Sequence, residues 1–501
     1  MPGAFVKTRF VRIAQDRHVK MAIAIGVIAI AVRFLAINQP FVDEWSWRQS
    51  DVAAIARNFY QTGFHVAYPQ IDWAGDQPGY VGTEFPILPV IAALCYKVFG
   101  IHEWVGRVQS VILFAASLPF FFLLVRRTLG ATAATWATFF YSFAPLSIMT
   151  SRCFMPDIPS LGLSIAGLYL FLRWTEEERI ALLIAAALAT SLAILIKLPT
   201  VLIGVPIACL ALRRHGVAAI RLLPLWMFAA IALLPSLAWY WHAHRIAEQF
   251  YPHHFFGAGG IQFESLGWYW KIAKRTTLYG LTPILLALAV AGFWTTRSDA
   301  KARVFHWWLG AILFFIVVAG YGNRHPWYQL PLVPVAAALA GGACACLAMR
   351  LSNRRWVLGM ASAIVIVLFG ALSYISARQF YRESAADLRT LGLELKRTTE
   401  PGSLIIAADY GDPTVFYYAE RKGWHFLEIN GIYNGHPNTS ADAISDLEEL
   451  RSRGATHIVF YSGTQWWLDY YAEFATHLEK TATLREATSQ FRIYALGSPT
   501  R

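Results

Sequence analysis

Charged residues are scarce in this chain of 501 residues, at 15% against about 25% in a typical soluble protein. Hydrophobic residues make up 56%. The shortage of charge excludes a string of water-soluble domains, and the high apolar content excludes a disordered chain. The composition therefore predicts a polytopic membrane protein. Its net charge of +12 does not imply a nucleic-acid partner, because membrane proteins concentrate Lys and Arg in cytoplasmic loops.

Cysteine is also rare, with five residues and none after residue 346, so the C-terminal part has no disulfide framework. Several catalytic motifs are missing as well. The chain has no G-x-x-x-x-G-K-[ST] run, which disfavours an ATP-driven pump. It has no D-x-D triplet, which disfavours a sugar-nucleotide enzyme that uses that metal motif. No H-E-x-x-H or G-x-S-x-G run occurs either.

Long apolar runs are plentiful instead. We identify about eleven runs near the length of about 20 residues that an α-helix needs to cross a bilayer. A further run at 86–99 is too short to cross comfortably and is typical of a re-entrant or interfacial segment. The predicted spans are 19–38, 103–125, 131–150, 158–174, 180–196, 198–212, 221–240, 278–296, 304–321, 327–349 and 355–376.

Basic residues fall in every second connection between these runs, as expected for cytoplasmic loops. The pattern predicts a multi-pass protein with a cytoplasmic N-terminus, and an odd number of spans places the C-terminus outside. The first run ends without an A-x-A cleavage site, which favours an uncleaved span over a signal peptide. The basic connections contain Lys7, Arg9, Arg12, Arg17 and Lys20; Arg126 and Arg127; Arg213 and Arg214; Arg297, Lys301 and Arg303; and Arg350, Arg354 and Arg355.

The C-terminal residues differ from the rest in composition and pattern. Short apolar strand-like runs alternate there with helical segments, which is typical of a small α/β domain. We therefore predict a transmembrane domain over 1–377, with long outer loops at 39–102 and 241–277, and an extracytoplasmic α/β domain over 378–501. The expected strands are 404–408, 424–427, 456–461 and 491–496, and the expected helices are 413–421, 441–453 and 468–479.

The first outer loop carries the strongest functional candidates. Asp43 and Glu44 directly follow the first span, where carboxylates are costly and usually functional. Val52, Ile55, Ala56 and Phe59 have helical spacing, which predicts a short amphipathic helix on the membrane surface. Arg57 lies off that stripe, and we expect it to be an ordinary interfacial cation. Arg48 and Glu84 are expected near the lipid headgroups.

Polar residues in other outer turns fall at the same depth. A plain structural pair is one interpretation of Arg152 and Asp157, and substrate binding is the other. Cations at this level can clamp a lipid phosphate or simply anchor the protein to anionic lipids. The candidates for the first role are Lys197, Arg324 and His325, in addition to Arg48.

The order of these motifs resembles the polyprenyl-phosphate-dependent glycosyltransferases of the GT-C fold. That family includes protein mannosyltransferases and the aminoarabinose transferase that modifies lipid A. The resemblance covers about residues 40–350, followed by an outer α/β tail. The chain departs from the aminoarabinose branch at Trp45-Ser46-Trp47, which leaves the sugar and the acceptor open. The matching motifs are Asp43-Glu44, Arg48-Gln49-x-Asp51, Glu84-x-Pro86, Phe99-Gly100, Val105-Gly106-Arg107, Ser151-Arg152, Met155-Pro156-Asp157 and Tyr328 to Pro334.

The resemblance implies an inverting transfer from a sugar on undecaprenyl phosphate or a related polyprenyl phosphate. Asp43, with Glu44 beside it, is implied as the catalytic carboxylate, and Asp43 is our candidate for the base. The leaving phosphate needs charge stabilisation, which the four cations named above are expected to supply. Glu84, Arg152 and Asp157 are expected to bind or orient substrate.

The partners implied are a polyprenyl-phosphate sugar, membrane lipids and a glycolipid, glycan or protein acceptor in the bacterial inner membrane, and no nucleic acid. The sequence identifies no cofactor and leaves open whether a divalent metal is needed. Two alternatives remain at this stage. One is a ligase that moves whole glycans from a lipid pyrophosphate, and the other is a transporter or flippase. Transporters usually place ionisable residues near the bilayer midplane, whereas here most of the charges lie in outer loops.

Overall fold

The computed structural model describes residues 16–256, 260–429 and 432–497. The chain forms two compact units. Unit 1 comprises Met1–Ile37, Arg107–Trp239 and Ala258–Gln379, and unit 2 comprises Asn38–Gly106, Tyr240–Gly257 and Phe380–Arg501. Most of the first outer loop therefore groups with the C-terminal residues rather than with the helical part. The basic residues Lys7, Arg9 and Arg12 lie outside the described residues.

Unit 1 is helical, and every predicted span falls on one or two of its helices. Among the described residues, six helices are long and apolar enough to cross a membrane, or seven if the bent pair Leu266–Leu281 and Pro283–Thr296 counts as one span. The protein is therefore a helical membrane protein. Its helices are α2 (Arg17–Arg33), α5 (Glu103–Leu129), α6 (Ala131–Phe143), α7 (Pro145–Thr150), α8 (Asp157–Glu177), α9 (Ile180–Ile196), α10 (Gly204–His215), α11 (Leu223–Gln249), α12 (Leu266–Arg275), α13 (Pro283–Thr296), α14 (Arg303–Ala319), α15 (Leu332–Arg350) and α16 (Arg355–Ala377), with the short helices η1 (Leu198–Ile203), η2 (Gly216–Arg221), η3 (Thr276–Leu281), η4 (Gly320–Asn323) and η5 (Pro326–Gln329).

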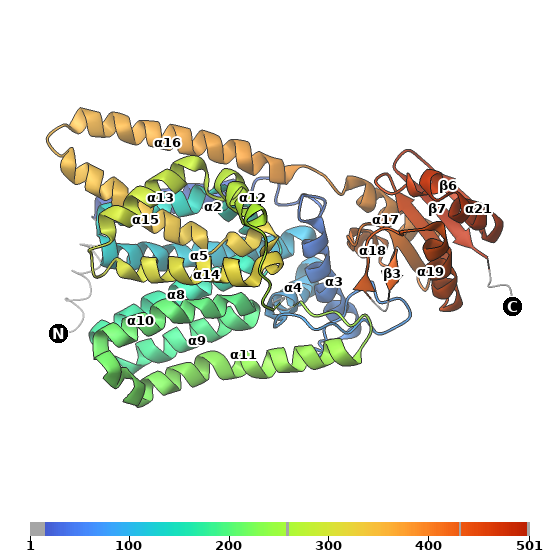
Figure 1. Ribbon diagram of the computed structural model, residues 1–501, viewed down its shortest axis with the longest axis horizontal. Helices are drawn as coiled ribbons and strands as arrows, with labels where there is room; N and C mark the ends of the chain where they lie inside the picture. The colour runs from blue at the N-terminus through green and yellow to red at the C-terminus, as the bar shows by residue number, and fades with distance from the viewer. Residues whose placement is uncertain (1–15, 257–259, 430–431, 498–501) are drawn as a thin grey trace. The chain divides into compact units, whose positions relative to one another are not determined.

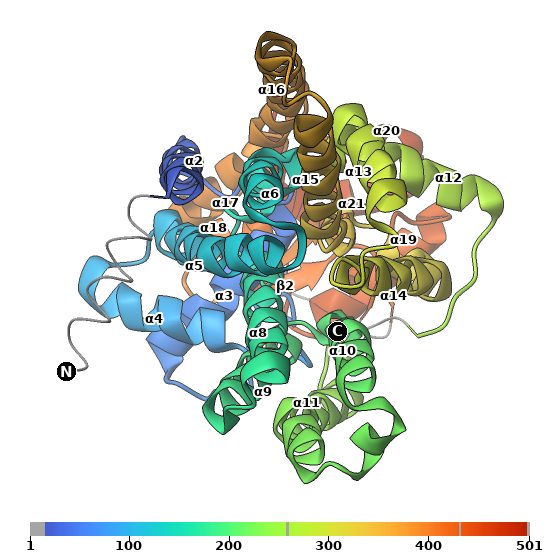
Figure 2. The ribbon, with the colours of Figure 1, turned by 90° about the vertical axis from the view of Figure 1, so that its left-hand side faces the viewer.

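Small residues bring the membrane helices close together. Helix α15 packs along both α6 and α13, and α8 packs along α9 (Figures 1 and 2). A Cβ atom on Gly292 of α13 would lie 1.9 Å from the carbonyl oxygen of Leu339 in α15. A Cβ atom on Gly341 would lie 2.3 Å from the carbonyl oxygen of Ala133 in α6. Such close backbone contact is how helices gain packing energy in lipid, where no hydrophobic effect draws them together.

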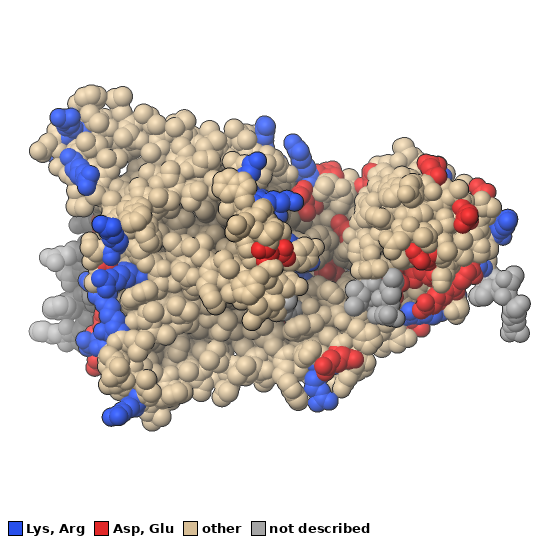
Figure 3. All heavy atoms as spheres, in the orientation of Figure 1, with Lys and Arg blue, Asp and Glu red and all other residues tan. Residues whose placement is uncertain are grey.

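Positive charge gathers at one end of the helical unit. Figure 3 shows a band of Lys and Arg there, with little charge along the helices. Arg127, Arg213, Arg214 and Lys301 come from three different connections and line one cavity. Basic connections that are separate in the sequence therefore lie together, as the predicted topology requires.

Unit 2 contains a five-stranded sheet in the order β2-β1-β5-β7-β6. The first three strands in that order are parallel, and β7 runs antiparallel to both β5 and β6. Two predicted strands have the bounds of β1 and β7, and a third begins one residue before β5. The fourth, 424–427, overlaps only the second half of β2. The elements are β1 (Leu404–Ala408), β2 (Lys422–His425), β3 (Glu428–Ile429), β4 (Ile432–Tyr433), β5 (His457–Tyr461), β6 (Ala482–Ala487), β7 (Phe491–Leu496), α3 (Ser46–Thr62), α4 (Ile87–Phe99), α17 (Ala386–Thr398), α18 (Thr414–Ala419), α19 (Ser440–Ser452), α20 (Trp467–Tyr470) and α21 (Ala472–Thr481).

Both faces of this sheet are buried. Side chains alternate along β1, so Ile406 faces α19 and α21 while Ile405 faces α17 and α18. The apolar cluster that contains Ile405 also contains Val42, Ile55 and Phe59 from the first outer loop. The apolar stripe predicted for α3 therefore packs against the C-terminal residues.

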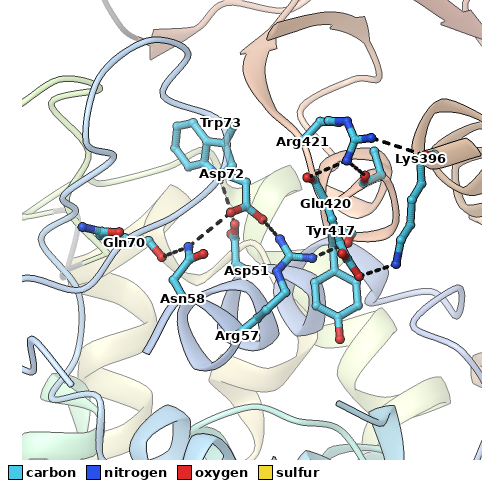
Figure 4. A network of polar contacts seen from close by, with 11 residues as sticks. Asp51, Arg57, Asn58, Gln70, Asp72, Trp73, Lys396, Tyr417, Glu420 and Arg421 are labelled. Atoms are coloured by element: carbon cyan, nitrogen blue, oxygen red, sulfur yellow. Dashed lines mark hydrogen bonds and ion pairs between the residues drawn. The ribbon is translucent and has the colours of Figure 1, made fainter. Parts of the chain in front are cut away.

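The expectation that Arg57 is an interfacial cation is wrong. Its side chain is buried, and its guanidinium forms an ion pair with Asp72 (Figure 4). The same guanidinium donates to the carbonyl of Tyr417, and Asn58 donates to Asp72 at 3.2 Å. The polar side of α3 is covered by protein, which the spacing of its apolar residues could not reveal.

Candidate active site

Asp43 is fully buried, three residues before α3 begins. Its Oδ1 atom accepts a hydrogen bond from the side-chain amide of Gln49 at 2.9 Å and another from the backbone N–H of Trp45 at 3.1 Å. The backbone N–H of Ser46 donates to the carbonyl of Asp43 at 2.9 Å. The start of α3 thus holds this carboxylate in one orientation.

Glu44, Arg48 and Glu84, the other predicted residues of the first outer loop, belong to the same unit as Asp43. Glu44 is exposed. Partial desolvation and the neighbouring charge of Asp43 raise the pKa of Glu44, and Arg382 offsets part of this. Arg48 is buried, and its Nη2 atom donates to both carboxylate oxygens of Glu84, at 2.7 and 2.8 Å. Arg48 and Glu84 are therefore brought together.

Two further carboxylates lie on or beside α3, Asp51 and Asp412, and the sequence did not indicate a catalytic role for either. Ser46 donates from Oγ to Oδ2 of Asp412 at 2.6 Å. Asp51 is buried and accepts a hydrogen bond from the indole of Trp73 at 2.9 Å. Burial raises the pKa of Asp51 to about 6, although the hydrogen bond from Trp73 lowers it in part.

A buried histidine–carboxylate pair lies at the carboxyl ends of the parallel strands. His425 ends β2, and its Nδ1 lies 2.8 Å from Oδ1 of Asp409, which follows β1. Burial raises the pKa of Asp409, whereas the charge of His425 lowers it in part. No pattern in the sequence predicted that His425 would lie at the same edge of the sheet as Asp409.

The remaining candidates lie in unit 1, where Lys197 and Asp157 form an ion pair. Lys197 follows the last residue of α9, and its Nζ lies 2.6 Å from Oδ1 of Asp157 at the start of α8. The ammonium also lies 4.7 Å from the ring centroid of Tyr328. These groups stand at a cavity whose other walls are mostly apolar, including Leu161, Ile203, Trp308, Ile312, Phe315 and Leu330. A cation beside an apolar cavity suits a phosphate attached to a hydrocarbon chain.

The other three candidates of unit 1 lie in different environments. Arg324 is exposed, with its guanidinium 4.6 Å from the ring centroid of Tyr321. His325 stacks on Trp327, a residue of the cavity wall, at 4.5 Å between ring centroids. Arg152 is fully buried and donates from Nη2 to the carbonyl of Ala36 at 2.9 Å.

Within the part of the chain that the structure describes, no three His, Cys, Asp or Glu side chains converge as metal ligands do. In unit 2, the fixed carboxylate of Asp43 is suited to removing a proton. In unit 1, Lys197 at an apolar cavity is suited to binding a lipid phosphate.

Comparison with known proteins gives consistent results. The family model of the dolichyl-phosphate-mannose-protein mannosyltransferases matches residues 76–241. A comparison with the sequences of curated proteins finds no match. The structure is similar to that of ArnT from Cupriavidus metallidurans bound to undecaprenyl phosphate, with a TM-score of 0.66 and 16% identity over 95% of this chain and 98% of that one. It is also similar to the oligosaccharyltransferase AglB from Archaeoglobus fulgidus in complex with an inhibitory peptide and a dolichol-phosphate, with a TM-score of 0.61 and 13% identity over 97% and 75% of the two chains.

The chain has the GT-C glycosyltransferase fold. The family match covers residues 76–241 and agrees with the resemblance and with the predicted kind of enzyme, a glycosyltransferase. The matched range begins inside the first outer loop and ends in α11. It therefore includes Glu84, Arg152, Asp157 and Lys197 of this GT-C protein.

Two residues of this GT-C protein were missed as site residues although the sequence offered a signal. Gln49 belongs to the Arg-Gln-x-Asp motif, and its spacing of six residues from Asp43 fits a helix that begins in between. Tyr328 belongs to another of the matching motifs and contacts Lys197.

Proposed function

We propose that this chain transfers a sugar from a polyprenyl-phosphate donor to a hydroxyl group of an envelope glycolipid, a glycan or a protein. The reaction is a single displacement with inversion. The acceptor oxygen bonds to the anomeric carbon as the bond from that carbon to the phosphate oxygen breaks, and polyprenyl phosphate leaves. The proton of the acceptor hydroxyl passes to a carboxylate of the protein.

The observation that carries this proposal is the fixed carboxylate of Asp43. A general base must hold one orientation while the new bond forms. Oδ1 of Asp43 accepts two hydrogen bonds, from Gln49 and from the backbone of Trp45, and these hold the carboxylate in one orientation. Glu44 beside it is exposed and is the second candidate for this role.

The leaving group is a phosphate, which needs positive charge more than it needs a proton. Lys197 fits this role because its ammonium stands at an apolar cavity and is oriented by Asp157. Arg324 and His325, on the η4–η5 segment, are proposed as further contacts for the phosphate. Arg152 is proposed to bind or orient the substrate.

Arg48 was also predicted to contact the phosphate, and we retain that proposal. Its bond to both oxygens of Glu84 supports an orienting role for that glutamate, because a cation held by a carboxylate keeps a fixed direction. Asp157 has the same relation to Lys197. In both pairs the carboxylate holds the cation in place.

We further propose that the chain crosses the bacterial inner membrane about eleven times, with the N-terminus in the cytoplasm and an α/β domain over 378–501 on the outer face. Two observations support this topology. Each predicted span falls on helices of unit 1, and basic residues gather at one end of that unit (Figure 3). The carboxylates proposed for catalysis would then lie on the face opposite the cytoplasm.

The purified full chain, reconstituted with a panel of polyprenyl-phosphate sugars and a mixed envelope extract as acceptor, tests this function. We expect release of free polyprenyl phosphate together with a glycosylated acceptor. Release of a polyprenyl pyrophosphate and transfer of a whole glycan would instead show a ligase. Movement of the lipid-linked sugar across the bilayer without cleavage would show a flippase.

A further inference from the structure

At the basic end of unit 1 a second cavity opens, with a volume of about 390 Å³. Three helices, α5, α8 and α10, and the connection from α13 to α14 contribute to its walls. It shares no lining residue with the cavity beside Lys197. Its lining residues are Arg127, Thr128, Leu172, Thr175, Glu176, Leu210, Arg213, Arg214 and Lys301.

The charge of this cavity is unbalanced. Four cations line it against one carboxylate, Glu176, which is already paired with Arg127. Arg214 pairs with Glu178 at 2.9 Å. Over the described ranges of the chain, neither Arg213 nor Lys301 has a carboxylate within ion-pair distance, and Arg213 donates only to the carbonyl of Ala300.

Two uncompensated cations that share one cavity attract an anion. Arginine binds phosphate well because its planar N–H groups match two phosphate oxygens at once, and lysine adds a point charge. Arg213 and Lys301 are both exposed, so an anion can reach them. The hydroxyls of Thr128 and Thr175 donate to carbonyls of their own helices, so the anion is held by the two cations.

The apolar part of the wall indicates which kind of phosphate fits. Leu172 and Leu210 belong to helices α8 and α10 that run into the apolar part of the unit. A free phosphate ion gains nothing from such a wall, whereas a phospholipid headgroup presents its phosphate to the cations and its first acyl carbons to the leucines.

We propose that this cavity binds the phosphate group of an anionic glycerophospholipid. The site is separate from the one proposed for the sugar donor, and it does not depend on the catalytic role of Asp43. Its occupant neutralises Arg213 and Lys301 and links α10 to the α13–α14 connection.

Lipid retention by the purified full chain tests the proposal. The protein is equilibrated in mixed micelles that contain equal amounts of phosphatidylglycerol and phosphatidylcholine, and bound lipid is measured by native mass spectrometry. We expect the wild type to retain phosphatidylglycerol selectively. Arg213→Gln combined with Lys301→Gln should weaken that binding at least about tenfold, because the phosphate loses a charge-assisted hydrogen bond at each position.

The matched control is Arg354→Gln with Arg355→Gln, which removes the same charge from another exposed basic connection. We expect this control to bind phosphatidylglycerol like the wild type. Equal losses in both double variants would overturn the site, as would a wild type without preference for phosphatidylglycerol. Competition by inorganic phosphate or by polyprenyl phosphate at equal strength would also contradict it. A thermal unfolding curve in neutral detergent shows whether each variant is folded. The single variant Lys301→Gln replaces the double variant of Arg213 and Lys301 if that one is not folded, and Arg354→Gln alone is then its control.

Discussion

The side-chain amide of Gln49 donates a hydrogen bond to Oδ1 of Asp43, at 2.9 Å. Gln49 lies in the first turn of α3, and Asp43 lies just before that helix. The backbone N–H of Trp45 donates to the same oxygen, at 3.1 Å. Two donors at the start of α3 thus bind one carboxylate oxygen. A helix is more rigid than a loop, so it fixes the orientation of the carboxylate more firmly.

Gln49→Ala should therefore lower kcat by about tenfold, because a hydrogen bond to a charged group is worth about 1.5–3 kcal/mol and part of that maintains the orientation. KM for the donor should change little. The measurement is steady-state release of polyprenyl phosphate. Gln77→Ala, the same change at an exposed position, is the control. An unchanged kcat in a folded Gln49→Ala variant would show that this hydrogen bond has no role in catalysis.

Lys197→Met should reduce turnover by about 10²–10³-fold, because the leaving phosphate loses a positive charge in the transition state. The single variant also removes the ion pair between Lys197 and the buried carboxylate of Asp157, which destabilises the fold. Lys197→Met combined with Asp157→Asn separates the two effects. We expect the double variant to regain thermal stability while turnover stays low, and Lys271→Met, at an exposed position, to keep full activity. Recovery of turnover with recovery of stability would argue against a phosphate contact.

The buried pair of Arg57 and Asp72 predicts a large effect on stability (Figure 4). Arg57→Gln should lower the free energy of unfolding by about 3–5 kcal/mol, because it leaves a buried carboxylate without its partner. Lys396→Met removes one partner of the exposed pair with Glu420, and it should cost less than about 1 kcal/mol. Thermal unfolding of both variants compares them directly. Similar shifts for both would mean that the Arg57 pair is solvated in the native protein.

The contrast between Arg57 and the apolar residues of α3 shows how far the sequence could predict this fold. Spacing identified the helix, since Val52, Ile55 and Phe59 repeat every three or four residues. The spacing does not predict which residues cover the polar side of α3. The segments around Asp72 and Tyr417 do so, one from the same loop and the other some 360 residues away. Contacts of that sequence separation leave no local periodic signal.

In the candidate site, too, the sequence predicted single residues but not the contacts between them. Asp43 was predicted because a carboxylate directly after an apolar run is costly there. Lys197 was predicted for the same reason, as a cation between two apolar runs. Its ion pair with Asp157 joins the start of α8 to the end of α9, which requires knowing that these helices pack antiparallel. His425 and Asp409 meet only because β1 and β2 are parallel neighbours.

Asp51 predicts a pH dependence of stability. Burial raises its pKa from 3.8 to about 6, while Trp73, Arg48 and His425 lower it in part. Because the folded pKa lies above the unfolded one, the folded state binds the proton more tightly between about pH 4 and pH 6. Asp51 therefore contributes most to the free energy of unfolding below about pH 4, and this contribution is lost as the pH rises through about 6.

Asp51→Asn keeps an oxygen that can accept the indole hydrogen bond of Trp73 and removes the charge. It should raise the free energy of unfolding at pH 7.5 by up to about 3 kcal/mol and have little effect at pH 4. Unfolding measured at both pH values tests this, with Asp469→Asn at an exposed position as the control. A difference of the same size at both pH values would contradict the raised pKa.

The central claim is that the carboxylate of Asp43 removes the proton of the acceptor. Its most direct test is the release of free polyprenyl phosphate by the wild type and by Asp43→Asn, measured in parallel with the same donor and acceptor. Asn has the same shape and no basicity, so we predict a loss of about 10²–10⁴-fold in kcat, with donor binding and thermal stability retained. Equal release by the two proteins would contradict the claim and move the base to another carboxylate, with Glu44 the first to test.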